Sequence, residues 1–185
     1  MNIEFFKKSE WFKPISMALY LLVFPAIGQQ GPSAPTPKLS YAFSVNVEVA
    51  KPVEQGQVDG GQRRFIEITG GTVYGPLLQG EVMHGGGDWQ TVFSGGFTDI
   101  LARYFLKLED GTVVEVTNPG VRVASEKVIT QLSKGEVVDP SKYYFRTTPT
   151  FKVTGDKYNW MTRHVFVARG IRNPKDVIID YYMVE

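Results

Sequence analysis

The chain has 185 residues, of which 43% are apolar and 13% aromatic, and it carries 20 basic and 19 acidic side chains but no cysteine. This composition is typical of one globular domain, and a net charge of +1 gives no field that would recruit nucleic acid or an anionic membrane by itself. Without a thiol the chain can form no disulfide, thiolate nucleophile or cysteine-based metal site, so its chemistry must use oxygen and nitrogen groups.

The first 28 residues have the order of a secretory signal peptide. Lysines at positions 7, 8 and 13 precede an apolar run from Ile15 to Ile27, and the small residues Ala26 and Gly28 lie at its end. The run is too short to span a bilayer core, which needs about 20 residues. We therefore expect residues 1–28 to be removed and the mature protein to be periplasmic or secreted, with an uncleaved anchor as the alternative.

A proline-rich linker is expected at residues 29–38. Gly31, Pro32, Pro35 and Pro37 fall within this stretch, and such a composition stays extended because it can bury little apolar area. Residues 39–185 then form a single domain, which is long enough to bury one core without crosslinks.

Apolar side chains occupy every second position from Leu39 to Val49, which predicts a strand with one buried face. Less regular strands are predicted at 65–69, 73–83, 89–93, 99–108, 112–117, 143–153, 164–168 and 177–184. Asp110-Gly111 lies between two of these segments and predicts a hairpin with a type I′ turn.

One short helix is predicted after Ser125, which is a suitable N-cap, and Gly135 is expected to end it. Many antiparallel strands with one helix, and glycines at 70, 71, 75 and 80 that would bend them, indicate an all-β fold. We predict a small antiparallel closed β-barrel of about eight to ten strands, with a sandwich as the alternative. Charges on both faces of segments such as 101–107 argue against stable membrane insertion of the mature chain.

The segment from His84 to Gln90 is the first candidate site. Alternation along a strand would place Asp88 and Gln90 on one side and Trp89 on the other, while the sequence does not show which side faces a cavity. Asp88 is a candidate acid or base at a barrel mouth. Alternatively, it binds backbone amides in a turn and Trp89 belongs to the core.

The second candidate site contains Tyr144 and Arg146, which share one face of a predicted strand. A cavity-facing Arg146 would need a carboxylate partner, for which Asp88 is the candidate, or an anionic ligand. The alternative is an Arg146 that faces solvent. Further polar and aromatic groups that could contact a ligand are Arg103, Tyr104, Arg122 and Trp160.

No metal or cofactor site is predicted. His84 and His164 lack the spacing of metal ligands, no G-x-S-x-G nucleophile motif occurs, and the glycine-rich stretch at 69–72 leads into a strand instead of a helix.

Several ordered motifs run along the chain: Thr69-Gly70-Gly71-Thr72, Gly86-x-Asp88-Trp89-Gln90, Ala102-Arg103-Tyr104, Tyr144-Phe145-Arg146-Thr147-x-Pro149 and Tyr158-x-Trp160. In these motifs the chain resembles the domain of unknown function family 3237, also called uncharacterised protein family 0311. The resemblance implies a small antiparallel β-barrel but supplies no family-wide activity and no catalytic residues. The chain departs from the family pattern in its leader, its linker and Gly87, where alanine is common.

Three functions remain open from the sequence. The first is a barrel that binds a small aromatic or acidic organic molecule, and the second is a cofactor-independent lyase, isomerase or cyclase. In the second, Asp88 would exchange a proton while Arg146 and a tyrosine, Tyr144, stabilise an oxyanion. The third is a structural envelope protein without a ligand. The sequence does not indicate the oligomeric state.

Overall fold

The computed structural model describes residues 34–185. The predicted signal peptide and the first part of the predicted linker, residues 29–33, lie outside the described residues. The rest of that linker, residues 34–38, is exposed and has no regular secondary structure.

Eleven strands in one sheet, two α-helices and two 3₁₀ turns make up the structure. In chain order they are β1 (Leu39–Val49), β2 (Val53–Val58), β3 (Gly61–Tyr74), β4 (Gly80–Val82), β5 (Gly86–Val92), η1 (Ser94–Gly96), β6 (Phe97–Leu108), β7 (Val113–Ala124), α1 (Glu126–Ser133), η2 (Pro140–Lys142), β8 (Tyr143–Thr147), β9 (Thr150–Lys152), α2 (Trp160–Arg163), β10 (Phe166–Arg172) and β11 (Asp176–Val184).

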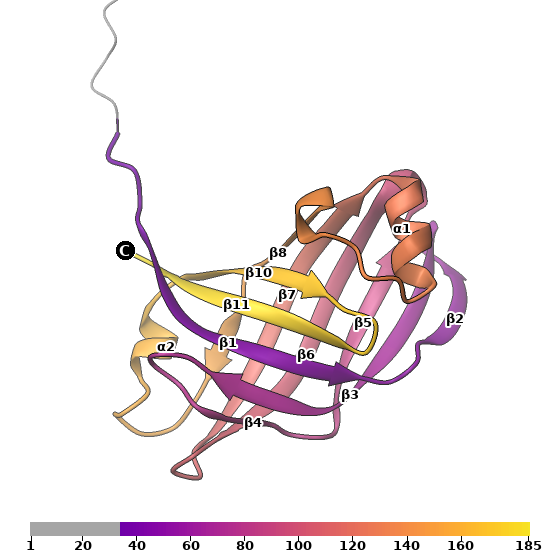
Figure 1. The fold of residues 1–185 in the computed structure, drawn as a ribbon. Helices are drawn as coiled ribbons and strands as arrows, with labels where there is room; N and C mark the ends of the chain where they lie inside the picture. The colour runs from indigo at the N-terminus through magenta and orange to yellow at the C-terminus, as the bar shows by residue number, and fades with distance from the viewer. Residues whose placement is uncertain (1–33) are drawn as a thin grey trace, which may run out of the picture. The chain divides into compact units, whose positions relative to one another are not determined.

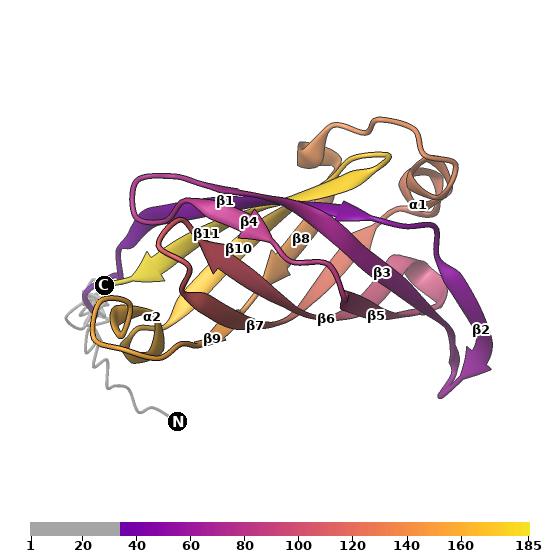
Figure 2. The same ribbon diagram turned by 90° about the horizontal axis from the view of Figure 1, so that it is seen from below.

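Eight of the strands form a closed antiparallel ring, which confirms the predicted barrel. The ring runs β1, β3, β5, β6, β7, β8, β10 and β11, and β11 pairs again with β1. β2 pairs with β3, β4 bridges β3 and β6, and β9 pairs with β7. In Figure 1, α1 and β2 lie near one end of the barrel and α2 lies near the other. Figure 2 shows the same arrangement from below.

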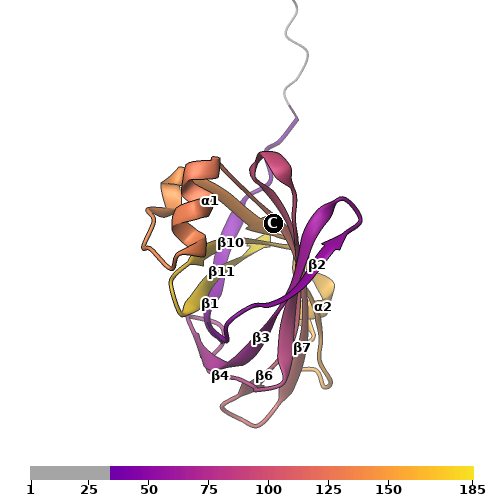
Figure 3. The ribbon, with the colours of Figure 1, turned by 90° about the vertical axis from the view of Figure 1, so that its right-hand side faces the viewer.

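The two ends of the barrel differ in what fills them. Toward α2, the rings of Phe43, Phe151, Phe166 and Tyr181 pack together, with centroid distances from 4.6 Å for Phe43 and Tyr181 to 6.0 Å for Phe43 and Phe151. Toward α1, polar side chains enter the interior. Figure 3 looks at this second end, where α1 and β2 lie on opposite sides. We call this end the mouth.

The predicted helix is confirmed as α1. Ser125 is its N-cap and its Oγ accepts a hydrogen bond from the backbone N–H of Val128, while Gly135 has a φ of +76° just after the helix. Val128 and Leu132 are buried, so the apolar stripe faces the barrel. A second helix, α2, was not predicted, because a single turn of four residues is too short to show helical periodicity.

The predicted hairpin between β6 and β7 is confirmed, but its turn type is not. Gly111 has a φ of +83°, whereas Asp110 does not have a positive φ, so the turn is not type I′. Positive φ at two successive residues occurs instead at Asp59 and Gly60, in the two-residue turn between β2 and β3.

None of the helices within residues 34–185 is both long and apolar enough to cross a membrane.

Candidate functional site

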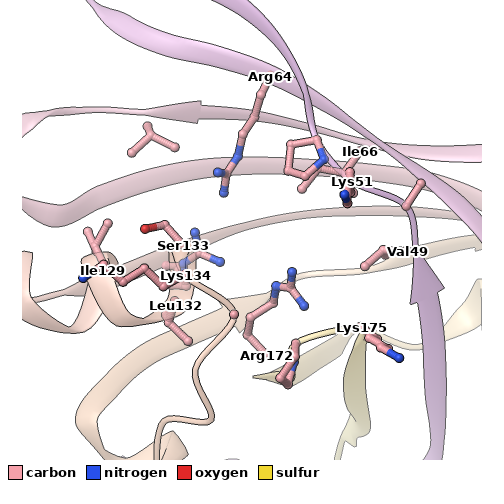
Figure 4. Close-up of a pocket in the computed structure, with 16 residues that line it drawn as sticks. Val49, Lys51, Arg64, Ile66, Ile129, Leu132, Ser133, Lys134, Arg172 and Lys175 are labelled. Carbon is pink, nitrogen blue, oxygen red and sulfur yellow. The ribbon is translucent and has the colours of Figure 1, made fainter.

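The mouth contains a pocket of about 570 Å³. Its walls come from α1 and the loop after it, from the ends of β3, β7 and β10, and from the segments that follow β1 and precede β11. Figure 4 shows Arg64 and Arg172 extending into this pocket from opposite sides, with Ile129, Leu132 and Lys134 on the α1 side. The basic side chains that line the pocket are Arg64, Arg122, Arg172, Lys51, Lys134 and Lys175, and no acidic side chain of the described residues lines it.

A smaller inner chamber of about 40 Å³ adjoins this pocket inside the barrel. Val49, Arg122 and Arg172 line both spaces, so they mark the boundary between them. The chamber also contacts Asp88, Gln90 and Tyr104, and its remaining lining is Val47, Ile68, Ile100, Ala102, Phe145, Val177 and Ile179. It therefore combines a few polar groups with apolar walls.

Strand alternation explains why polar side chains from distant segments meet here. In β5, Asp88 and Gln90 face the interior while Trp89 is exposed on the outside. In β10, Phe166, Ala168 and Gly170 are buried, and the same face carries Arg172 at the end of the strand.

A chain of side-chain hydrogen bonds orients the carboxyl group of Asp88. Arg64 donates to Gln90 Oε1 from Nε at 3.1 Å and from Nη2 at 2.6 Å, and Gln90 Nε2 donates to Asp88 Oδ2 at 2.5 Å. The other carboxyl oxygen, Asp88 Oδ1, is buried and has no hydrogen-bond partner among the described residues. One oxygen of Asp88 is thus held in place and the other is unused.

Arg122 is the least satisfied of the three arginines at the mouth. It is only 5% exposed, its Nε has no hydrogen-bond partner, and it forms no ion pair with any residue of 34–185. Arg172, in contrast, is anchored by its Nη1, which donates to the carbonyl oxygens of Asn173 and Asp176, the latter at 3.1 Å. Burying a charge without a partner lowers the stability of the fold, so we expect Arg122 to have a role other than stability.

The buried groups of this site have shifted pKa values. Burial raises the pKa of Asp88, although its hydrogen bond from Gln90 and the charges of Arg122, Arg64 and Arg172 act in the opposite direction. Burial, with a smaller contribution from the positive charges of Arg64 and Arg172, lowers the pKa of Arg122 to about 10, and the charge of Asp88 opposes this shift. Burial likewise lowers the pKa values of Arg64 and Arg172. Arginine still stays protonated at neutral pH.

The structure brings four of the predicted site residues together: Asp88, Gln90, Tyr104 and Arg122 all line the inner chamber. Tyr144 and Arg146 lie elsewhere, so the alternative of a solvent-facing Arg146 holds and the alternative in which Arg146 faces Asp88 is wrong. Tyr144 is 52% exposed, and the Arg146 guanidinium lies 5.2 Å from its ring centroid, on the outside of β8. The reason is that Tyr143, Phe145 and Thr147 take the inward positions of this strand.

The other predicted ligand contacts also lie outside the chamber. Trp89 packs on the outer surface against Phe65, with ring centroids 5.1 Å apart, and exposed Arg103 pairs with Glu115 at 3.1 Å. Trp160 begins α2 at the opposite end of the barrel, where it packs against Phe166 at a centroid distance of 5.9 Å. None of these three side chains lines the mouth or the chamber.

Two arginines of the site, Arg64 and Arg172, were not predicted. Arg64 alternates with Ile66 and Ile68, both buried, so the period of two could have identified it as inward-facing. Arg172 lies beyond the predicted strand end at Ala168, because Arg169 and Gly170 interrupt the apolar pattern. Its strand is extended by pairing with β11, which local sequence does not show.

The two histidines lie outside this site. His84 Nε2 is 3.2 Å from Glu67 Oε1 at the surface, and His164 Nδ1 is 2.8 Å from the carbonyl oxygen of Trp160. Within the part of the chain that the structure describes, no group of three or more histidine, aspartate or glutamate side chains could hold a metal ion.

Fold and site together define a small antiparallel β-barrel protein with a basic pocket at one end. The chain belongs to the family described as "Protein of unknown function (DUF3237)", whose model matches residues 37–184. A curated relative from Clostridium acetobutylicum, a UPF0311 protein, is 40% identical over 143 residues, which are 77% of this chain and 90% of the relative. This confirms the family resemblance seen in the sequence.

Solved structures agree with this fold. A conserved protein of unknown function from Rhodopseudomonas palustris matches with a TM-score of 0.80 and 33% identity, covering 82% of this chain and all of that one. A protein from Acinetobacter baumannii described as "beta-barrel like" matches with a TM-score of 0.71 and 37% identity, covering 85% of this chain and all of that one.

Proposed function

We propose that the barrel binds a small organic anion through the basic pocket at its mouth. The observation that carries this proposal is Arg122, a buried arginine whose Nε has no partner and which shares its surroundings with Arg64 and Arg172. A carboxylate of a ligand would supply the missing charge and accept hydrogen bonds from the guanidinium in a planar, paired geometry.

The remaining walls suit the organic part of such a ligand. Ile66, Ile129 and Leu132 give the outer pocket apolar surface, and its volume of about 570 Å³ falls within the range of small-molecule sites. Lysines at positions 51, 134 and 175 add positive charge to the lining and would attract an anion toward the mouth. The proposed ligand is therefore an aromatic or aliphatic carboxylic acid, bound with its charged group inward.

A thermal-shift screen with matched ligands tests this proposal. Benzoate and short aliphatic carboxylates should raise the Tm, whereas benzamide, which has a similar shape but no charge, should not. At a ligand concentration about a hundredfold above Kd the expected stabilisation is about 2.7 kcal/mol.

Arg122→Met should abolish this shift and also stabilise the unliganded protein by about 1 to 3 kcal/mol, since it removes a buried charge without a partner. Arg146→Met, the same substitution on the outer face, should leave ligand binding intact and change stability by less than about 0.5 kcal/mol. Equal ligand shifts in both variants would contradict the proposal. If no acid in the screen binds, the result would instead support the hypothesis of a structural protein without a ligand.

Asp88 supports a second candidate function, acid–base catalysis without a cofactor. Its Oδ1 is buried and unpaired in the chamber, Oδ2 is held by Gln90, and burial raises its pKa toward the range useful for proton transfer. Arg122 takes the place that the sequence suggested for Arg146 as stabiliser of an oxyanion. An Asp88→Asn variant that retains ligand binding but loses turnover would favour a lyase, isomerase or cyclase over a binding protein.

Export is a separate proposal. It rests on the pattern of residues 1–28 alone. Fractionation of cells that express the full chain, with N-terminal sequencing of the mature protein, tests it.

A further inference from the structure

Two tyrosine hydroxyl groups meet next to the inner chamber. Tyr104 from β6 and Tyr181 from β11 have their oxygens 2.5 Å apart, and both residues are buried. Tyr181 is completely buried and its ring stacks on Phe43 with a centroid distance of 4.6 Å. This is the only hydrogen bond that either hydroxyl makes among residues 34–185.

The number of hydrogens in this pair leaves one without an acceptor. Each hydroxyl carries one hydrogen, and a single hydrogen bond between the two oxygens uses only one of them. Asp88 does not accept the other, because its Oδ1 has no partner and the one hydrogen bond that its Oδ2 accepts among the described residues comes from Gln90. One tyrosine hydrogen is thus available to an acceptor that the described residues do not provide.

Burial decides which tyrosine keeps the free hydrogen. The surroundings of Tyr181 are aromatic, so a free hydrogen there would cost about 1 to 3 kcal/mol in lost hydration. Tyr104 lines the inner chamber and Tyr181 does not, so only Tyr104 can give its hydrogen to a molecule in that space. The favoured arrangement is therefore that Tyr181 donates to Tyr104, and Tyr104 donates into the chamber.

The chamber limits the size of the group that accepts this hydrogen bond. Its volume of about 40 Å³ holds roughly three water molecules, or a group of a few heavy atoms such as acetyl. Arg122 and Arg172 stand at its boundary with the outer pocket. A molecule that spans this boundary meets positive charge first and then, further inside, a hydroxyl donor.

We infer that the ligand is a short oxo carboxylate, an inference that rests on the anion-binding function proposed above. Its carboxylate lies at Arg122 and Arg172, and a carbonyl oxygen on a small terminal group accepts a hydrogen bond from Tyr104 in the inner chamber. Tyr181 is a positioning residue, because it acts by directing the Tyr104 hydroxyl. Any larger apolar substituent of the ligand lies in the outer pocket against Ile129 and Leu132.

Two ligands of equal shape test this inference by calorimetric titration. The probe is 4-oxopentanoate, and its control is 4-methylpent-4-enoate, in which a CH₂ group replaces the carbonyl oxygen. The wild-type protein should bind the oxo acid about tenfold more tightly, the value expected for one buried hydrogen bond. Tyr104→Phe should remove this preference while leaving the affinity for the alkenoate unchanged, and Tyr181→Phe should reduce the preference.

The alkenoate also shows whether each variant keeps a working pocket. If the wild-type protein binds both acids equally, the oxo-acid inference is overturned while the anion-binding function stands. If Tyr104→Phe keeps the tenfold preference, the assignment of Tyr104 is overturned. If neither acid binds the wild-type protein, both the inference and this form of the anion site are overturned.

Discussion

Three guanidinium groups lie at the mouth of this barrel, and the carboxyl group of Asp88 lies in the adjoining inner chamber. Arg64 is tied to Gln90 and Arg172 to backbone carbonyls, while Arg122 has an unpaired Nε. A folded protein keeps such a group only where another advantage offsets the loss of hydration, and ligand binding is the usual one. The unliganded barrel is therefore expected to be less stable than the same barrel with an apolar side chain at position 122.

Asp88 makes both stability and binding depend on pH. Burial raises its pKa in the folded protein above the ordinary value of 3.8. Between these two pKa values the folded state holds a proton that the unfolded state has lost, so the free energy of unfolding falls as the pH rises through that interval. Protonated Asp88 also does not repel a bound carboxylate, so anion affinity should rise as the pH falls through the same interval.

Urea unfolding and ligand titration over a pH series measure both effects. Asp88→Asn should flatten both profiles, because the amide stays neutral throughout. Asp99→Asn, a matched change at an exposed position of β6, should leave both profiles as in the wild type. If Asp88→Asn followed the wild-type pH profiles, the assignment of the proton to Asp88 would be wrong.

At this scale the sequence predicted pairs of residues on one face better than the direction of that face. Asp88 and Gln90 do share a face, and so do Tyr144 and Arg146, yet only the first pair points inward. Alternation defines two faces of a strand, and the apolar content of each decides which is buried. In β8 the face that contains Phe145 is the buried one, because burying this aromatic side chain is more favourable than burying the charged side chain of Arg146 on the other face.

Glycines in the strands permit close contacts that a side chain would block. Gly71 in β3 pairs with Val47 and has a φ of +136°, and a Cβ there would lie 1.9 Å from the backbone oxygen of Asn46. Gly87 in β5 makes room for an aromatic side chain on the outer face of the barrel. A Cβ at this position would meet the Phe65 ring at 2.1 Å, so the glycine makes room for the outer aromatic pair of Phe65 and Trp89.

Gly71→Ala tests the role of close strand approach. It should destabilise the barrel by more than about 3 kcal/mol, because backbone atoms would have to move as well as adopt an unfavourable φ. Gly111→Ala is the control, since its φ of +83° is also unfavourable but nothing lies within 4 Å of the added Cβ. That variant should lose only about 1 to 2 kcal/mol. Chemical denaturation measures both, and equal losses would show that β1 and β3 can separate at little cost.

Strand positions were predictable where the local pattern was strong. β1 has the predicted bounds, Leu39–Val49, because its alternation is unbroken. The predicted strand 143–153 is instead two strands, β8 and β9, with Pro149 between them, and a proline cannot donate to the ladder. The β2–β3 hairpin was missed although Asp59-Gly60 is the same kind of signal as Asp110-Gly111, because polar residues dominate β2.

The whole molecule combines a closed ring with an uneven interior. An eight-stranded barrel is only just wide enough for its own side chains, so a binding site is expected at one end and not along the whole axis. Here the aromatic cluster fills the end near α2, and the basic pocket occupies the mouth. Topology creates this arrangement, since the charges at the mouth come from strands far apart in the chain.

The overall composition could not show the local charge at the mouth. The net charge of +1 correctly describes the chain as a whole and hides three arginines and three lysines around one pocket, because acidic side chains lie elsewhere on the surface. Strand count, alternation and family motifs were enough for the barrel. The site required the register of strands that only the closed sheet defines.

A crystal structure of the protein with 4-bromobenzoate shows whether Arg122 binds a carboxylate, because the anomalous signal of bromine locates the ligand independently. The ring should lie in the mouth beside Ile129 and Leu132, with a carboxylate oxygen about 3 Å from Arg122 Nε. Bromine found instead on the outer face beside Tyr144 and Arg146, with Arg122 still unpaired in a mouth that holds no anion, would contradict anion binding at Arg122.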